Sequence, residues 1–293
     1  MSLLIGALAL GLSGGVLYGM IAFAVVWLYK CTGVVNFAQG AMATLSAFLV
    51  WNLVSEHGLP GWLAVLCALA AGAVTGILCY LLVIRINDGA PSENMLMRTL
   101  ALFLLISAAL DHEWGANSPY TFPKLLPSGS AFQVGGATIT WLSVTTILLG
   151  LLCAVVAWVF FKKTRWGLLF LALADNADAA TVVGVPVRKL SAMAWGVSGL
   201  VAVLVGVLVA SSTLLSVSLT DPYLLFALAA AVLGGLDSME GAMLGGMLVG
   251  VIDSIGTVYF GKDVATLLVF FVFLLTLLYR PRGILGRPNL QRV

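Results

Sequence analysis

Charged residues are scarce in this chain. Only 9% of its 293 residues are Asp, Glu, Lys or Arg, whereas 61% are hydrophobic. A soluble domain carries about 25% charged residues, so this chain has too few to cover a surface that faces water. The composition therefore predicts a polytopic membrane protein. The net charge of +2 is small and the basic residues are dispersed, so we expect no nucleic acid partner.

Residues suited to metal binding and catalysis are also few. The chain has two histidines, and its four cysteines form no CxxC pair, so we expect the cysteines to be small buried hydrophobic residues. Asp111, His112 and Glu113 are adjacent and cannot all point at one ion from regular structure, which favours a solvated helix end. No nucleophile is paired with a convincing base. We therefore expect neither a metal site nor an enzyme.

We expect neither a cleavable signal peptide nor a functional phosphate-binding loop in this sequence. No charge precedes Lys30, so the first apolar segment is expected to span the membrane. Residues 256–263 match GxxxxGK, but Asp263 stands where a Ser or Thr hydroxyl would bind magnesium. We expect no cofactor on this chain.

Long apolar runs make up most of the sequence. A helix needs about 20 apolar residues to span a bilayer, and the candidate runs 95–110 and 222–236 are among those shorter than that. We predict an all-α transmembrane bundle of about eight or nine spans, forming a single domain over residues 1–293. The candidate spans are 3–29, 34–54, 62–84, 95–110, 139–161, 191–213, 222–236, 241–259 and 264–279.

The basic residues predict the orientation of this bundle. Cytoplasmic loops carry an excess of Lys and Arg, and arginines crowd the C-terminus, so we place the C-terminus in the cytoplasm. Nine spans then put the N-terminus outside, with only Lys124 and Lys262 on the outer side. The basic residues on the cytoplasmic side are Lys30, Arg85, Arg98, Lys162, Lys163, Arg165, Arg188, Lys189, Arg280, Arg282, Arg287 and Arg292.

Turn residues and glycines add local predictions. Residues 85–94 carry Asn-Asp-Gly and Ala-Pro and are expected to form a cytoplasmic loop. Residues 111–138 contain three prolines and a Gly-Gly pair, which predicts an ordered external loop with a hairpin. Glycines four residues apart within 11–19, 72–76 and 241–250 predict close packing between helices.

Residues 162–190 form a charge-bearing interruption between two apolar runs. Basic residues stand at both ends, and a short amphipathic run lies between them. We interpret the run as a cytoplasmic helix presented to another protein; the alternative is a solvated connector. Asp175, Asn176 and Asp178 supply polar caps for this run. Ala179 and Ala180 favour a helix, and Gly184 with Pro186 ends it.

Three polar side chains interrupt apolar runs. Asn36 and Gln39 are expected to enter the second span on nearly one face, where buried amides must form hydrogen bonds. They either bridge helices or line a polar pathway. Asp253 is the one carboxylate inside a predicted span, which makes it a functional candidate. The alternatives are a partnered structural acid or an acid near the outer interface.

Four stretches resemble the permeases of branched-chain amino acid ABC importers. Residues 33–40 resemble that family's Gly-Val-Ile-Asn-Phe-Ala-His-Gly signature, and residues 164–185 resemble its cytoplasmic loop. Residues 233–242 are similar to its Leu-Gly-Gly-x-Gly-Ser-x-x-Gly-Ala motif, and residues 280–286 to its Arg-Pro-x-Gly-Leu-x-Gly ending. The similar stretches occur in the family's order along nearly the whole chain.

The resemblance implies a membrane subunit of an ATP-driven importer in the bacterial cytoplasmic membrane. Two permease subunits would form the pathway, with a related but non-identical chain as the second. Two cytoplasmic ATPases would bind ATP and Mg²⁺, and an external binding protein would deliver the solute. The coupling residues would be Asp175, Asn176, Asp178, Ala179, Ala180, Gly184 and Val185, and the pathway residues Asn36, Phe37, Gln39, Gly40 and Asp253.

The sequence departs from the family pattern in three places. Gln39-Gly40-Ala41 stands where His-Gly-Glu is common, Asp237 replaces a glycine, and Asp111 replaces an apolar or amide residue. We therefore expect a neutral polar pathway for a small amphipathic solute, with a branched-chain amino acid as the leading candidate. The alternatives are a permease for urea or short amides, and a self-sufficient secondary transporter that uses Asp253.

Overall fold

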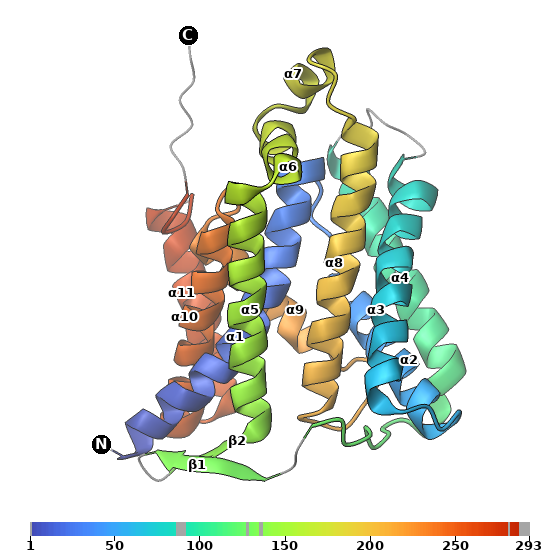
Figure 1. The fold of residues 1–293 in the computed structure, drawn as a ribbon. Helices are drawn as coiled ribbons and strands as arrows, with labels where there is room; N and C mark the ends of the chain where they lie inside the picture. Colours follow the sequence, from blue (N-terminus) through green and yellow to red (C-terminus); the bar gives the residue numbers. More distant parts are fainter. Residues whose placement is uncertain (1, 86–91, 127–128, 135–136, 281, 287–293) are drawn as a thin grey trace. The chain divides into compact units, whose positions relative to one another are not determined.

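The structure is a computed structural model of the 293-residue chain. It describes all residues except 1, 86–91, 127–128, 135–136, 281 and 287–293. The chain is mostly helical, with one short antiparallel hairpin (Figure 1). Most of the predicted 85–94 loop and two of the C-terminal arginines, Arg287 and Arg292, lie outside the described residues.

The described residues form eleven α-helices and two strands. A π-helical turn, Tyr80–Ile84, follows α3, and a 3₁₀ turn, Gly115–Asn117, follows α4. The elements are α1 (Ser2–Thr32), α2 (Gln39–Ser55), α3 (Gly61–Cys79), α4 (Ser92–Trp114), β1 (Ser130–Val134), β2 (Ala137–Thr140), α5 (Trp141–Lys163), α6 (Arg165–Asp175), α7 (Ala177–Val182), α8 (Val187–Ala210), α9 (Asp221–Gly234), α10 (Met239–Phe260) and α11 (Lys262–Tyr279).

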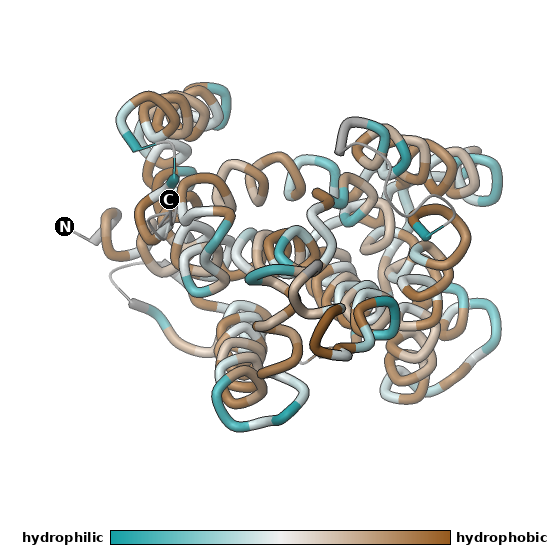
Figure 2. Tube along the Cα trace, turned by 90° about the horizontal axis from the view of Figure 1, so that it is seen from above, coloured by the Kyte–Doolittle hydropathy of each residue, from teal (hydrophilic) through white to brown (hydrophobic). Residues whose placement is uncertain are grey.

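Seven of the described helices are long and apolar enough to cross a membrane. Hydrophobic residues predominate along the helices, and hydrophilic residues gather mainly at their ends and connections (Figure 2). The helix α4 is longer than the predicted run 95–110, because the helix continues through Asp111, His112 and Glu113 to Trp114. The predicted solvated helix end at these three residues is therefore confirmed.

The helices α2 and α9 are the two predicted spans that fall short of this length. The helix α9 has 14 residues, and α2 has 17 because it begins at Gln39 rather than at residue 34. Gly33 ends α1 with φ +69°, a conformation that favours glycine, and the chain stays non-helical up to α2. The prediction that Asn36 lies on a helix is therefore wrong.

The described chain divides into two compact units, and the boundary between them falls inside α1, α5 and α9. Unit 1 contains residues 1–26, 130–154 and 225–293; unit 2 contains residues 27–129 and 155–224. In unit 1, β1 and β2 form the hairpin expected within 111–138, although a strictly all-α fold was predicted. The two helices α10 and α11 pack against each other.

Glycines bring α1 and α10 together in unit 1. A Cβ atom added at Gly15 would lie only 2.8 Å from the Cα atom of Met247 and 2.9 Å from the carbonyl oxygen of Gly246. The hydroxyl of Ser254 donates a hydrogen bond of 2.7 Å to the carbonyl of Ala7 across the same pair of helices. The predicted close packing at these glycines is confirmed, and it suits a bilayer because small residues let helix backbones approach.

Unit 2 is built around α8, which packs against both α2 and α3. A Cβ atom added at Gly72 of α3 would lie 2.9 Å from the carbonyl oxygen of Gly199 of α8. The indole of Trp27, in the last part of α1, donates a hydrogen bond of 3.2 Å to the carbonyl of Ala194. Within unit 2, α6 and α7 lie at the end where α3 finishes and α4 begins, opposite residues 115–126 (Figure 1).

Candidate functional site

The predicted coupling segment contains two short helices, α6 and α7, rather than one. The hydroxyl of Thr164 accepts a hydrogen bond of 2.9 Å from the backbone N–H of Gly167 and caps α6. The side chain of Asn176 accepts one of 2.9 Å from the N–H of Ala179 and caps α7. Side-chain acceptors satisfy the free N–H groups at a helix start, so these polar residues fix where each helix begins.

The helix α6 is anchored in unit 2 by aromatic packing. The ring of Phe170 lies 4.9 Å from the ring of Trp27, and that of Phe161 lies 5.0 Å from the same indole. Phe170 and Gly167 are buried, whereas Trp166 is half exposed. One face of α6 is thus held against α1 and α5, so α7 projects from a fixed base.

The tip at the end of α7 presents apolar side chains to the surface. Val182 is 87% exposed and Val183 is 77% exposed, whereas Ala180 is buried. Gly184 follows with φ +84° and reverses the chain towards α8. The two adjacent valines offer apolar surface that another protein could cover. The sequence reasoning named Ala180 and missed Val182 and Val183.

Basic residues lie at the helix ends that flank the α6–α7 segment. The exposed side chains at the end of α5, the start of α6 and the start of α8 are Lys162, Lys163, Arg165, Arg188 and Lys189. Asp175 closes α6 and is exposed, Asp178 lies within α7, and Val185 follows Gly184. The predicted coupling residues therefore lie in one continuous projection of unit 2.

The structure joins Asn36 and Gln39 in a buried hydrogen-bond network. Asn36 Nδ2 donates to Gln39 Oε1 at 3.2 Å, and Gln39 Nε2 donates to the carbonyl of Ser198 at 3.1 Å. The hydroxyl of Ser198 donates back to Gln39 Oε1. The backbone N–H of Ala38 also donates to Asn36 Oδ1, at 3.0 Å. The network links the segment before α2 to α8, and both amide side chains are buried.

Gly40 connects α2 to the start of α9. Its carbonyl accepts a hydrogen bond of 2.6 Å from the hydroxyl of Thr220, which lies 2.7 Å from the hydroxyl of Thr44. Phe37 is partly exposed in the non-helical segment before α2. Four of the five predicted pathway residues therefore lie together around the first turn of α2, namely Asn36, Phe37, Gln39 and Gly40.

Asp253 belongs to unit 1, where it has charged and polar partners. Lys262, at the start of α11, forms an ion pair with it at 2.8 Å. The hydroxyl of Tyr18 on α1 donates a hydrogen bond of 3.3 Å to the same carboxylate. Sequence reasoning placed Lys262 in an outer loop and did not connect it with Asp253. Asp253 is thus a partnered acid, one of the alternatives considered for it.

Comparison with known proteins identifies a family of permeases. The family model described as "Branched-chain amino acid transport system / permease component" matches residues 7–278. The permease BraD of the high-affinity branched-chain amino acid transport system of Pseudomonas aeruginosa is 28% identical, over 97% of this chain and 96% of its own. The probable branched-chain amino acid transport permease LivH of Methanocaldococcus jannaschii is 26% identical, over 94% of this chain and 91% of its own.

A solved structure shows a similar fold. The structure of PsaBC from Streptococcus pneumoniae in complex with Fab aligns with a TM-score of 0.50 and 16% sequence identity, covering 93% of this chain and 91% of that chain. At this identity the likeness concerns the fold alone. Because the family model covers almost the whole sequence, the chain belongs to the permease components of branched-chain amino acid transport systems.

Proposed function

We propose that this chain forms half of the translocation pathway of an ATP-driven importer for a branched-chain amino acid or a similar small amphipathic solute. The observation that carries the proposal is the match of the permease family model to residues 7–278. BraD, which is similar over nearly its whole length, is named for high-affinity branched-chain amino acid transport. The chain itself supplies no ATP site in this proposal; ATP and Mg²⁺ bind to partner subunits.

The partners follow from the division of labour in such an importer. The second half of the pathway comes from a related, non-identical permease, and two ATPase subunits bind on the cytoplasmic side. An external binding protein delivers the solute. The projection formed by α6 and α7 supports ATPase docking, because Val182 and Val183 offer exposed apolar contacts that a fixed base holds in place.

The charge distribution supports the proposed orientation in a bacterial cytoplasmic membrane. Within unit 2, the basic residues at the ends of α1, α3 and α5 and at the starts of α4, α6 and α8 gather at the end that carries α7, and Lys124 lies in the segment at the opposite end (Figure 1). Cytoplasmic sides carry the excess of Lys and Arg. We place α7 in the cytoplasm, and we propose that α2 and α9 complete nine spans, with the N-terminus outside.

We propose that the first turn of α2 borders the pathway. The network of Asn36, Gln39 and Ser198 uses the hydrogen-bonding groups of the two amides, so these side chains hold α2 against α8 and set the position of Phe37 and Gly40. Asp253 is neutralised by Lys262, which favours a structural role and disfavours a secondary transporter that uses this acid.

Native purification tests the proposal. The chain is tagged at its C-terminus, extracted in mild detergent from cells that carry the neighbouring genes, and the co-purifying proteins are identified by mass spectrometry. We expect a second permease and ATPase subunits. A chain that arrives alone, or only with copies of itself, would contradict the importer and support a self-sufficient transporter.

A further inference from the structure

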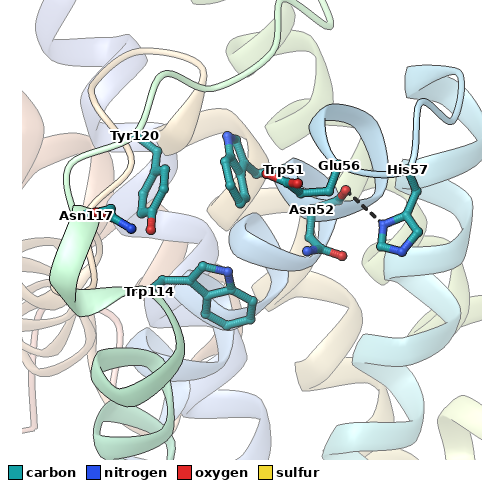
Figure 3. A pocket seen from close by; sticks show the side chains of 7 residues that line it. All are labelled: Trp51, Asn52, Glu56, His57, Trp114, Asn117 and Tyr120. Carbon is teal, nitrogen blue, oxygen red and sulfur yellow. Dashed lines mark hydrogen bonds between the residues drawn. The ribbon is translucent and has the colours of Figure 1, made fainter.

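Aromatic rings border a hollow of about 480 Å³ in unit 2 (Figure 3). The segment after α4, which supplies part of the lining, lies at the end of unit 2 opposite α7 (Figure 1). Trp51 of α2, Trp114 at the end of α4 and Tyr120 in the following segment supply the rings. The ring centroids of Trp51 and Tyr120 lie 4.5 Å apart, and Trp114 stacks on Phe48 at 4.9 Å. These contacts hold the rings, so the aromatic wall is formed before any ligand arrives.

The backbone fixes the same wall from the other side. The N–H of Tyr120 donates a hydrogen bond of 2.8 Å to the carbonyl of Leu215, and the N–H of Leu215 donates one of 2.9 Å to the carbonyl of Tyr120. This pairing joins the segment after α4 to the segment after α8. The hollow is therefore bordered by parts of the chain that are held together rather than by a free loop.

Polar side chains complete the lining. The carboxylate of Glu56 and the amides of Asn52 and Asn117 border the space between the rings (Figure 3). His57 lies at the edge, with Nδ1 3.3 Å from the carbonyl oxygen of Asn52. The residues that line the hollow include neither Lys nor Arg. The hollow thus combines one carboxylate with three aromatic rings, with His57 at its edge.

This combination selects for positive charge. The faces of Trp and Tyr rings attract an ammonium group through the ring quadrupole, and a carboxylate adds a charge-assisted hydrogen bond. A ligand carboxylate would meet the Glu56 carboxylate, and the lining offers it no Lys or Arg, only the imidazole of His57 at the edge. We propose that the hollow binds the ammonium group of a small aliphatic amine.

An apolar neighbour favours an alkyl chain on that amine. Trp114 also lines a second cavity of about 210 Å³, which is bordered by Leu45 and Leu49 of α2 among other residues. An ammonium group held at Glu56 would leave its alkyl part against Trp114 and this apolar surface. This inference goes beyond the proposed transport function, because it concerns a recognition site at one end of unit 2 and holds whatever solute crosses the membrane.

The binding test uses the full chain, with its co-purifying subunits, in nanodiscs of phosphatidylglycerol, a lipid without an ammonium group. Isothermal titration calorimetry compares 3-methylbutylamine with its uncharged counterpart, 3-methylbutanol. We expect the amine to bind about tenfold more tightly or better, which corresponds to about 1.4 kcal/mol. Glu56→Gln should weaken amine binding about tenfold, whereas Glu113→Gln, an exposed acid outside the lining, should leave it unchanged.

A second pair of variants separates ring contacts from folding. Trp51→Phe keeps an aromatic face and should retain most of the amine affinity, whereas Trp51→Leu should lower it several-fold. A thermal unfolding curve for each variant identifies any loss caused by misfolding. Equal binding of amine and alcohol, or unchanged binding in Glu56→Gln, would overturn the proposal.

The lipid composition of the nanodisc distinguishes two sources of the ammonium group, a lipid headgroup and a free amine. In nanodiscs that contain phosphatidylethanolamine, a headgroup that occupies the hollow would compete and lower the apparent affinity for 3-methylbutylamine. Unchanged affinity would identify a free amine as the ligand. Both results agree with ammonium binding in the hollow. If the amine does not bind, the ATPase subunits should still co-purify, so failure of this proposal can be told apart from failure of the proposed transport function.

Discussion

Lys262 reaches back across the turn between α10 and α11 to Asp253, and its Nζ atom lies 2.8 and 2.9 Å from the two carboxylate oxygens. The same Nζ lies 5.1 Å from the centroid of the Phe226 ring. The carboxylate side chain is only 12% exposed, whereas that of Lys262 is 57% exposed. The lysine therefore neutralises a nearly buried acid from a position that remains in contact with the surroundings.

Replacement of this acid should affect stability more than transport. Asp253→Asn removes the ion pair but keeps a polar group that can accept from Tyr18. Because Lys262 is more than half exposed, we expect unfolding to become easier by about 1 kcal/mol, with most ATP-dependent uptake retained. Thermal unfolding and uptake of labelled solute measure the two effects.

Two further variants serve as controls: the single variant Lys262→Met, and the double variant that combines Asp253→Asn with Lys262→Met. If the two residues act as a pair, the double variant should lose less stability than the sum of the single variants. Complete loss of transport in Asp253→Asn, with normal stability, would instead make the acid part of an ion or proton pathway.

The exposed tip of α7 should be required for contact with the ATPase. Val183→Asp places a charge where a partner would bury an apolar side chain, so we expect ATPase subunits to co-purify at a level several-fold lower. The valine is 77% exposed, so the fold of the permease should not change. Western blotting of the purified complex measures the ratio of subunits.

Leu214→Asp is the matched control for Val183→Asp. Leu214 is also exposed, at 58%, but it follows α8 at the end of unit 2 opposite α7. We expect it to leave the amount of bound ATPase unchanged. If Val183→Asp and Leu214→Asp give the same ratio as the unmodified chain, the α6–α7 segment is only a connector. Ala180 is less suited to this test because it is buried, and a bulky replacement there would disturb α7 itself.

The buried network at Gln39 should contribute measurably to stability. Gln39→Leu leaves Asn36 Nδ2 without its oxygen acceptor on residue 39, and Ser198 loses the acceptor for its hydroxyl. An unsatisfied buried polar group costs about 1–3 kcal/mol, so we expect a clearly lower thermal midpoint. Ser198→Ala removes one hydroxyl and should cost less. A Gln39→Leu variant with normal stability but no uptake would indicate that the amide contacts the solute.

Neighbouring glycines of α1 offer a sharp test of helix packing. A Cβ atom at Gly15 would lie 2.8 Å from the Cα atom of Met247, whereas nothing lies within 4 Å of one at Gly14. Gly15→Ala should separate α1 from α10 and destabilise the chain by about 1–3 kcal/mol. Gly14→Ala should be neutral or slightly stabilising, because alanine favours the helix. Equal thermal midpoints for the two variants would contradict the packing described for unit 1.

Local patterns made several elements predictable from the sequence. The apolar runs located the long helices, and the glycines four residues apart predicted close helix packing, although not that α1 packs against α10. Asn176 was recognised as a cap because its side chain competes for a nearby backbone N–H, and this interaction depends only on residues close in sequence. Asp111, His112 and Glu113 were predicted to be a solvated helix end because three adjacent residues cannot all point at one ion.

The remaining features depend on distant parts of the chain. Gln39 and Ser198 are 159 positions apart, so no local pattern shows that they meet. Val182 and Val183 look like two more core residues in an apolar sequence, and only the fold shows that they project outwards. The ion pair of Asp253 had a local signal, because Lys262 follows it by only nine residues. The pair could be predicted only if the end of α10 at Gly261 was known, since that end turns Lys262 back towards Asp253.

Uptake by the complete complex tests the central claim most directly. The chain is expressed with its partner permease, ATPases and binding protein in a host that lacks branched-chain amino acid transport, and uptake of labelled leucine, isoleucine and valine is measured against urea and short amides. We predict saturable uptake of at least one branched-chain amino acid that stops when the ATPase is inactivated. Uptake of urea or an amide alone would contradict the substrate class, and uptake that continues without a working ATPase would contradict the importer itself.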